Sequence, residues 1–124
     1  MKRTLLLTVC ALGLIVAASA CTPIPGSSRQ QAVDAIARYF PEQRAKAERV
    51  ATCESGMNPA AVSPGGGNWG LFQINTVHKP MVARMGYSWS QITNAYVNAK
   101  VARVIYDDAD RRGSGWQPWS CGYA

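Results

Sequence analysis

The sequence predicts a mainly α-helical domain in which a small β or loop element lies between two helical parts. Apolar residues recur at helical spacing near the beginning and near the end of the domain. Between these regions, from Ser55 to Asn75, the helical period is lost, and glycine becomes frequent. We therefore expect a cleft where the glycine-rich segment separates the two helical parts.

Residues 1–20 have the features of an export signal. Lys2 and Arg3 provide a positive start, residues 5–18 are almost entirely apolar, and residues 18–20 are small, as at a cleavage site. The apolar stretch is shorter than the roughly 20 residues that a membrane-spanning helix needs. We therefore expect cleavage and export, with an uncleaved membrane anchor as the alternative.

Cys21 follows this cleavage site directly. Residues 18–21, Ala-Ser-Ala-Cys, resemble a bacterial lipobox, in which the cysteine is lipidated, although leucine is the usual residue where Ala18 stands. Membrane attachment through Cys21 and simple cleavage therefore both stay open. Either outcome places the protein outside the cytoplasm, as a secreted, wall-associated or lipid-anchored protein at the outer face of the membrane. Residues 21–28 are rich in proline, glycine and serine, which predicts a tether.

The remaining residues, 29–124, suffice for one domain but not for two. Loss of Lys2 and Arg3 lowers the basic count from 13 to 11 against 7 acids, so the formal net charge falls from +6 to +4. This charge favours an anionic partner such as cell wall or a membrane surface, with ordinary solubilising charge as the alternative. Nothing in the basic residues indicates nucleic-acid binding, and we expect a monomer.

Two helices are predicted in the first half of the domain. The first begins near Arg29 and ends before Pro41, because proline cannot continue a helix. Its apolar face comprises Val33, Ile36, Ala37 and Phe40. The second runs from about Glu42 to Glu54 and presents Ala47, Val50, Ala51 and Glu54 on one side. Its last turn therefore carries an acid on the apolar face.

A long helix is predicted from about Ser90 to Arg112, stopped by Gly113. Its apolar stripe comprises Val97, Val101, Val104, Ile105 and Ala109. The tail that follows is irregular, and we expect its tryptophans to hold it against the body of the domain.

Cys53 and Cys121 are the only cysteines within the domain. Because export exposes them to an oxidising environment, we expect them to form a disulfide. His78 is the single histidine and has no acidic or cysteine neighbour in sequence, so it is expected at the surface. We therefore expect neither a metal site nor a cofactor.

Glu54 is the candidate catalytic residue. Cleavage of a glycosidic bond requires an acid that protonates the leaving oxygen, and burial raises the pKa of a carboxyl group toward neutral pH. A glutamate at the end of a core helix, beside a glycine-rich wall that admits a sugar chain, suits this role. The alternative is an ion-paired helix residue without catalytic function.

The segments Cys53–Ser63 and Gly70–Ile74 resemble the signature of the soluble-type lytic transglycosylases, within the lysozyme-like superfamily. The resemblance implies that Glu54 is the general acid and base, that Ser63 orients this acid or the substrate, and that Gln73 lines the sugar cleft. The segment Thr93–Lys100, with its two asparagines, is similar to the family's later helix start, which packs behind the site. Peptidoglycan glycan strands would be the substrate.

The chain is also similar to the resuscitation-promoting factors in its Cys-Glu-Ser-Gly opening and its tryptophan-rich end at Cys121. The late Ala-Tyr-Asn-x-Gly motif of the transglycosylases is missing, and Trp116 to Trp119 stands near its expected place. Trp69, inside the motif, is expected to line the cleft and stack on a sugar ring.

The segment from Ser55 through Tyr106 contains no aspartate or glutamate. This absence favours a reaction with one carboxylate and an anhydro-sugar product over a two-carboxylate hydrolysis, although hydrolysis stays open. We expect the later acids, Asp107, Asp108 and Asp110, to be a solvated cluster. The alternative function is an inactive lysozyme-like protein that binds the cell wall, which the missing late motif supports.

Overall fold

The computed structural model describes residues 26–124, so the predicted export signal and Cys21 lie outside the described residues. The helices and strands are α1 (Ser28–Tyr39), α2 (Arg44–Ser55), β1 (Asn68–Trp69), β2 (Ile74–Asn75), α3 (Lys79–Arg84) and α4 (Ala95–Arg111). Single 3-10 turns are η1 (Pro41–Gln43), η2 (Pro64–Gly66), η3 (Thr76–His78) and η4 (Trp89–Thr93). This is the predicted mainly helical fold with a small β element. Within the described part, no helix combines the length and apolarity needed to cross a membrane.

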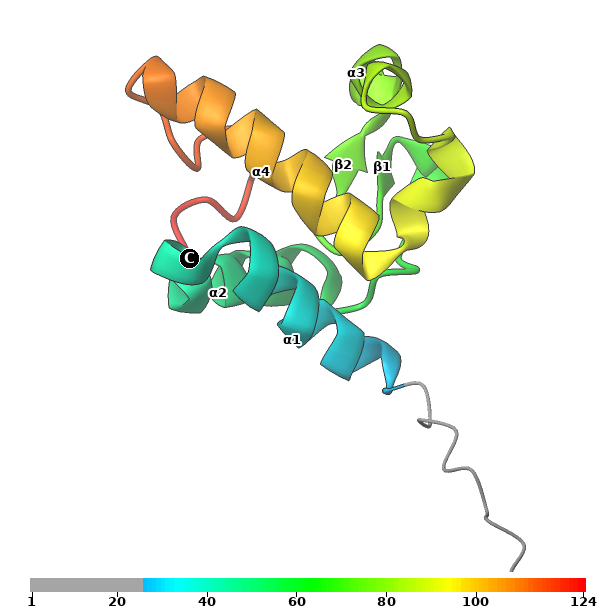
Figure 1. The fold of residues 1–124 in the computed structure, drawn as a ribbon, viewed down its shortest axis with the longest axis horizontal. Helices are drawn as coiled ribbons and strands as arrows, with labels where there is room; N and C mark the ends of the chain where they lie inside the picture. The colour runs from blue at the N-terminus through cyan, green and yellow to red at the C-terminus, as the bar shows by residue number, and fades with distance from the viewer. Residues whose placement is uncertain (1–25) are drawn as a thin grey trace, which may run out of the picture.

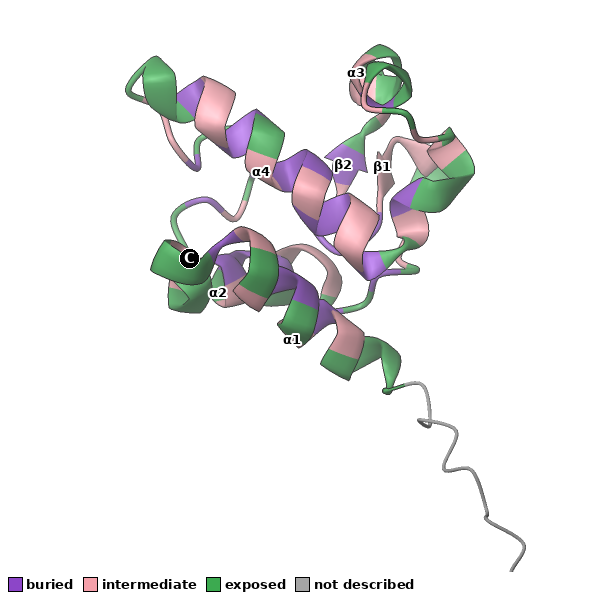
Figure 2. Cartoon of the chain, in the orientation of Figure 1, coloured by how far each residue is buried: buried purple, intermediate pink, exposed green. Residues whose placement is uncertain are grey.

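Helix α4 lies between two groups of elements (Figure 1). The α1–α2 pair covers one side of α4, and the antiparallel hairpin of β1 and β2 with α3 lies on the other. The segment after α4 turns back and ends beside α2 (Figure 1). Buried positions are frequent on α1, α2 and α4, whereas α3 is largely exposed (Figure 2). The long helix is therefore the common support of both halves.

The boundaries of α1 follow from its capping residues. The Ser27 hydroxyl accepts a hydrogen bond from the Gln30 amide at 3.2 Å, which satisfies a free donor of the first turn. Phe40 leaves the helical conformation, and Pro41 then opens η1. Because Ser28 already belongs to α1, the predicted tether of residues 21–28 overlaps the start of the folded domain.

The buried face of α1 is rotated slightly from the predicted stripe. Ile36 is fully buried as predicted, but Ala32 and Ala35 are buried more completely than Val33. This helix packs most extensively against α4, and alanines on the shared face allow the two backbones to approach closely. On α4, Val104 is 38% exposed instead of belonging to the core.

Helix α2 begins at Arg44, two residues later than predicted, because η1 occupies the segment before it. Its apolar face is confirmed, since Ala47, Val50 and Ala51 are fully buried. Gly56 ends the helix in the left-handed conformation, with φ of 64°, which glycine adopts at little cost. The last turn therefore places Glu54 at the edge of the core.

Helix α4 begins at Ala95 and not at Ser90. The Asn94 side chain accepts hydrogen bonds from the amides of Tyr96 and Val97, which makes Asn94 the capping residue. The residues before it form η4, a separate turn. Helix α3 was not predicted, because it is short and buries only Val82, so it leaves no periodic apolar pattern.

The tail is held to the body as predicted. Trp116 and Trp119 are buried, and their indole N–H groups donate to the Gln43 side chain at 2.7 Å and to the Phe72 carbonyl at 2.9 Å. Both tryptophans thus satisfy their one polar group while filling the core.

A buried asparagine joins α4 to the segment between the strands. Asn98 is fully buried, and its amide oxygen accepts the N–H of Phe72 at 2.8 Å. Its amide nitrogen donates to the carbonyls of Trp69 and Ile92 at 3.0 and 2.8 Å. This placement of Asn98 agrees with an expectation from the sequence. The start of the later helix, which contains two asparagines, was expected to pack behind the site.

Gly70 makes that close approach feasible. Its φ is 82°, and a β-carbon on it would lie 2.1 Å from the Asn98 amide nitrogen and 2.8 Å from the Ile92 carbonyl oxygen. Any side chain at this position would therefore displace the amide that holds the segment.

We predict that Gly70→Ala lowers the free energy of unfolding by about 2–5 kcal/mol, through left-handed backbone strain and collision with Asn98. The matched control is Gly65→Ala, because Gly65 has the same φ of 82° but has open space around its β-carbon position. That control should cost only about 1–2 kcal/mol. Urea unfolding of the three proteins measures both values, and equal losses would show that Asn98 does not resist the added methyl group.

Candidate active site

A cavity of about 320 Å³ opens beside the C-terminal end of α2. Its walls come from α2, the hairpin, η3, α4 and the tail, which are distant from one another in the sequence. The lining residues are Glu54, Asn68, Gln73, Ile74, Asn75, His78, Ile105, Pro118, Trp119 and Ser120. Amide and hydroxyl groups with one carboxyl group therefore dominate its polar chemistry.

Glu54 is half-buried in this cavity. Its Oε1 atom accepts a hydrogen bond from the backbone N–H of Cys121 at 3.0 Å. The helix positions the carboxyl group from one side, and the tail holds one of its oxygens from the other. The second oxygen is thereby left for a ligand in the cavity.

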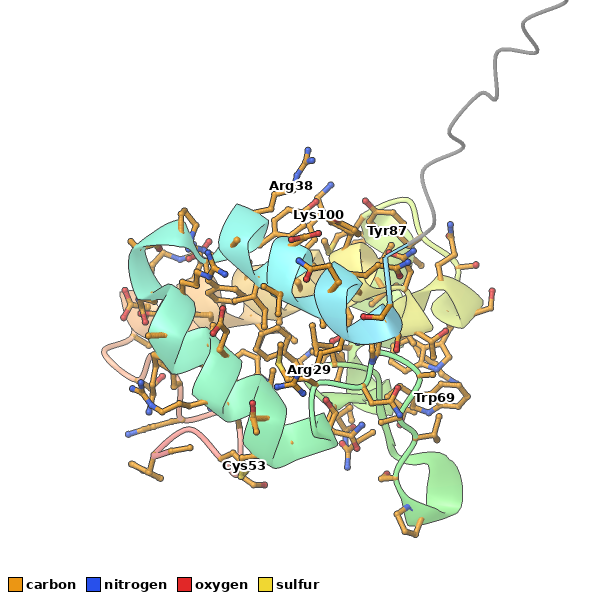
Figure 3. All side chains as sticks on the ribbon, turned by 90° about the horizontal axis from the view of Figure 1, so that it is seen from below. Arg29, Arg38, Cys53, Trp69, Tyr87 and Lys100 are labelled. Carbon is orange, nitrogen blue, oxygen red and sulfur yellow. A yellow bond between two sulfur atoms is a disulfide. The ribbon has the colours of Figure 1, made fainter. Side chains whose placement is uncertain are left out.

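Cys53 and Cys121 form the predicted disulfide, with their Cα atoms 5.9 Å apart. Cys53 lies on the last turns of α2 beside the tail (Figure 3). The bridge therefore joins the residue before Glu54 to the residue whose N–H binds Glu54. The disulfide thus restrains Glu54 both through its helix and through the N–H that binds its carboxyl group.

Ser55, the residue after Glu54, fastens the end of α2 to the segment between the strands. Its hydroxyl lies 2.7 Å from the Leu71 carbonyl oxygen and 3.1 Å from the Ala51 carbonyl oxygen. The same oxygen accepts the N–H of Asn58 at 3.2 Å. Ser55 therefore connects the helix carrying Glu54 to the segment that Asn98 holds, a role that its place in the motif did not reveal.

Gln73 lines the cavity, as its position in the motif predicts. Its backbone has a positive φ of 48°, and its side-chain nitrogen donates to the carbonyls of Gly70 and Ala61 at 3.0 and 3.3 Å. Both hydrogen bonds of the side-chain nitrogen stabilise the loop, so Gln73 would bind a substrate through its side-chain oxygen. The structure thus brings Gln73 and Glu54 to the same cavity.

Ser63 does not belong to the lining residues. Its hydroxyl accepts the N–H of Asn68 at 3.0 Å, and its own N–H donates to the Asn68 carbonyl at 2.9 Å. Ser63 therefore closes the loop around η2 and positions Asn68, which does line the cavity. Its expected role in orienting the acid or the substrate stays a prediction, and the geometry favours an indirect route.

Trp69 also lies outside the cavity lining. Its indole N–H donates to the Gly66 carbonyl at 2.7 Å, and its ring meets Trp89 edge-on with centroids 6.1 Å apart. These contacts support the hairpin. The expected stacking of Trp69 on a sugar ring stays a prediction.

The lining residues that were not predicted from the sequence as part of the site include Asn68, Asn75, His78 and Trp119. The two asparagines face each other across the hairpin, where the Asn75 side chain donates to that of Asn68 at 3.0 Å. His78 is half-buried, and this burial lowers its pKa below the ordinary value, so the neutral ring predominates at neutral pH. The sequence did contain one signal for this part of the site, because Asn68 and Asn75 stand directly before and after residues 69–74.

The later aspartates lie outside the cavity lining. Asp107 pairs with Arg103 at 2.8 Å, and Asp108 pairs with Arg111 at 3.2 Å and with Arg112. Among the described residues that line the cavity, Glu54 is the only carboxylate. The described part also contains no cluster of three or more His, Cys, Asp or Glu side chains that could hold a metal ion.

Comparison with protein families identifies one matching model, described as a lysozyme-like domain, over residues 29–121. No curated protein and no solved structure gave a significant match. The matched segment runs from the second residue of α1 to Cys121, so it contains every residue that lines the cavity.

We predict that replacing both cysteines, Cys53→Ser with Cys121→Ser, lowers the free energy of unfolding by about 4 kcal/mol, because the bridge restricts a long loop in the unfolded chain. The variant should also lose activity at temperatures where it is still folded, because without the bridge the backbone N–H of residue 121 is no longer fixed against the Glu54 carboxyl. Thermal unfolding and peptidoglycan clearing measure the two effects.

Ile36→Ala is the control for lost stability alone. Ile36 is fully buried in α1, and its truncation should cost about 2–5 kcal/mol without touching Glu54. Activity retained by this control and lost by the double cysteine variant supports the positioning role. Equal activity of both folded variants would contradict it.

Proposed function

Because the chain belongs to the family of lysozyme-like domains, we propose that it cleaves peptidoglycan glycan strands at the β-1,4 bond between N-acetylmuramic acid and N-acetylglucosamine. The observation that carries this proposal is the position of Glu54. A carboxyl group at a helix end, held by a backbone N–H, is the single acid in a cavity otherwise lined by neutral residues. This is the arrangement that acid catalysis on a sugar chain requires.

Glu54 acts first as the acid. Its proton passes to the glycosidic oxygen as the bond from that oxygen to the anomeric carbon of the muramic acid breaks, and the N-acetylglucosamine side leaves as an alcohol. The resulting carboxylate faces the positive charge that develops on the sugar ring. The Cys121 N–H, 3.0 Å from Oε1, stabilises this ionised form by hydrogen bonding.

Glu54 then acts as the base. The 6-hydroxyl of the same muramic acid attacks the anomeric carbon, its proton passes to the Glu54 carboxylate, and an anhydro ring closes. The nucleophile is already attached to the substrate, so it reacts at a high effective concentration. The absence of a second carboxylate among the lining residues supports this route over activation of water.

The amides along the hairpin are suited to hold the sugar chain. Asn68, Gln73 and Asn75 line the cavity, and side-chain amides can match the hydroxyl and N-acetyl groups of both sugars, Gln73 through its amide oxygen. Trp119 is buried and forms part of the wall, so it contributes shape more than a free stacking surface.

We also propose that the protein works outside the cytoplasm. The disulfide supports this location, because such bridges persist in oxidising compartments. Residues 1–20 would be the export signal, and lipidation of Cys21 would tether the domain to the membrane. Peptidoglycan lies in the same compartment, which agrees with the proposed substrate.

We predict that Glu54→Gln lowers the rate of peptidoglycan clearing by at least about 100-fold, because the amide keeps the volume but has no transferable proton. Glu48→Gln is the matched control, since Glu48 lies on the same helix and pairs only with Arg44 at the surface. The control should clear peptidoglycan normally. Clearing by Glu54→Gln at the wild-type rate would exclude Glu54, and a wild-type protein that binds but never clears would be an inactive wall-binding protein.

We predict anhydro-muropeptides as the products. Digestion in heavy-oxygen water followed by mass spectrometry tests this, because ring closure incorporates no solvent oxygen whereas hydrolysis places one at each new sugar end. A hydrolase with known chemistry serves as the labelling control. Predominantly labelled ends would show that a water molecule replaces the 6-hydroxyl in this cavity.

A further inference from the structure

A second hollow, of about 600 Å³, lies directly beside the candidate active site. It shares His78, Ile105 and Pro118 with the cavity around Glu54, so the two hollows adjoin at these residues. We call this second hollow the arginine groove. Its other walls include Val77, Met81, Arg84, Val104, Arg111 and Arg112, from η3, α3 and the C-terminal half of α4.

The arginine groove exposes apolar side chains that the core does not use. Val77 is 74% exposed and Val104 is 38% exposed, and they are two of the four large hydrophobic residues that the described part leaves exposed. Val104 points here although its place in the α4 stripe predicted burial. Apolar surface gathered in a hollow beside a candidate site indicates a contact with a ligand.

The arginine groove is also positively charged. Arg111 and Arg112 both pair with Asp108, so these three side chains together carry one positive charge. Arg84 is exposed and has no ion pair within the described residues, so it contributes a second positive charge to the groove. A ligand with two carboxylates and small apolar groups would complement this surface.

We propose that the arginine groove binds the acidic peptide branch that N-acetylmuramic acid carries in peptidoglycan. The inference rests on the proposed function, because the branch is attached to the sugar whose bond would lie at Glu54. Such a branch combines alanine methyl groups with the carboxylates of an acidic residue and a chain end. Its methyl groups match Val77 and Val104, and its carboxylates match the free guanidinium of Arg84.

A continuation of the sugar chain fits the groove less well. Sugar subsites combine the broad faces of tryptophan or tyrosine with side-chain amides, and the lining residues of the arginine groove include none of these. The cavity at Glu54 has Asn68, Gln73 and Asn75 for that purpose. The two hollows therefore divide the substrate between them, with the sugars in the first and the peptide in the second.

The test compares intact peptidoglycan with peptidoglycan whose branches an N-acetylmuramoyl-alanine amidase has removed. We expect Arg84→Glu to lower kcat/KM on the intact material by about tenfold, through a higher KM, because a charge-assisted contact is replaced by repulsion. On the stripped material this variant should match the wild type. Arg29→Glu is the control for charge, since Arg29 lies on α1 outside both hollows, and it should behave as the wild type on both materials.

The outcomes separate the inference from the proposed function. An equal loss by Arg84→Glu on both materials would show that the groove holds sugars, and no loss on either would show that it holds no part of the substrate; each result overturns the inference and leaves glycan cleavage intact. A wild-type protein that cleaves neither material would overturn the proposed function instead. Sedimentation with each material then still tests the groove, because Arg84→Glu should reduce binding to the intact material alone.

Discussion

The buried amide of Asn98 is the interaction on which the site depends. It satisfies one backbone group each of Trp69, Phe72 and Ile92, and each of these groups would cost free energy if buried without a partner. The Phe72 segment that it fixes also accepts the indole N–H of Trp119 through its carbonyl oxygen. The tail that this bond anchors delivers the Cys121 N–H to Glu54. A continuous path of contacts therefore runs from the first turn of α4 to the candidate acid.

The tail stabilises the domain through a disulfide and aromatic contacts. A longer domain could obtain the same stabilisation from additional helices. Trp116 and Trp119 fill the space beside Phe72, and the disulfide fixes the end of the tail to α2. In a domain this small, burial alone stabilises weakly, so a bridge contributes a large share of the stability. The same tail supplies Pro118, Trp119 and Ser120 to the cavity wall, so the cavity is complete only when the tail is folded against the body.

Charge is divided between the two hollows in a way that suits one substrate. The cavity around Glu54 contains neutral amides and a neutral His78, so its single acid has no charged partner among the lining residues. The positively charged side chains, Arg84, Arg111 and Arg112, line the arginine groove, and Asp108 forms ion pairs with the last two. Arginines beside Glu54 would favour the ionised carboxylate and oppose proton donation. The arginines lie in the adjoining hollow, outside the lining of the cavity around Glu54.

The sequence by itself determined the helical fold class, the apolar face of α2 and the pairing of the two cysteines, and it marked Glu54 and Gln73 as candidates, because these depend on local period, composition and a contiguous motif. The tertiary structure decided what depends on segments far apart in the chain. Asn68, Asn75, His78 and Trp119 meet at the cavity only through the hairpin and the folded tail, and no sequence period marks such a meeting. Ser63 and Trp69 stand in the motif but support the loop from behind, since their polar groups bond to the loop backbone. Val104 follows the apolar stripe of α4 yet faces the arginine groove, because α1 and the tail cover other sides of that helix.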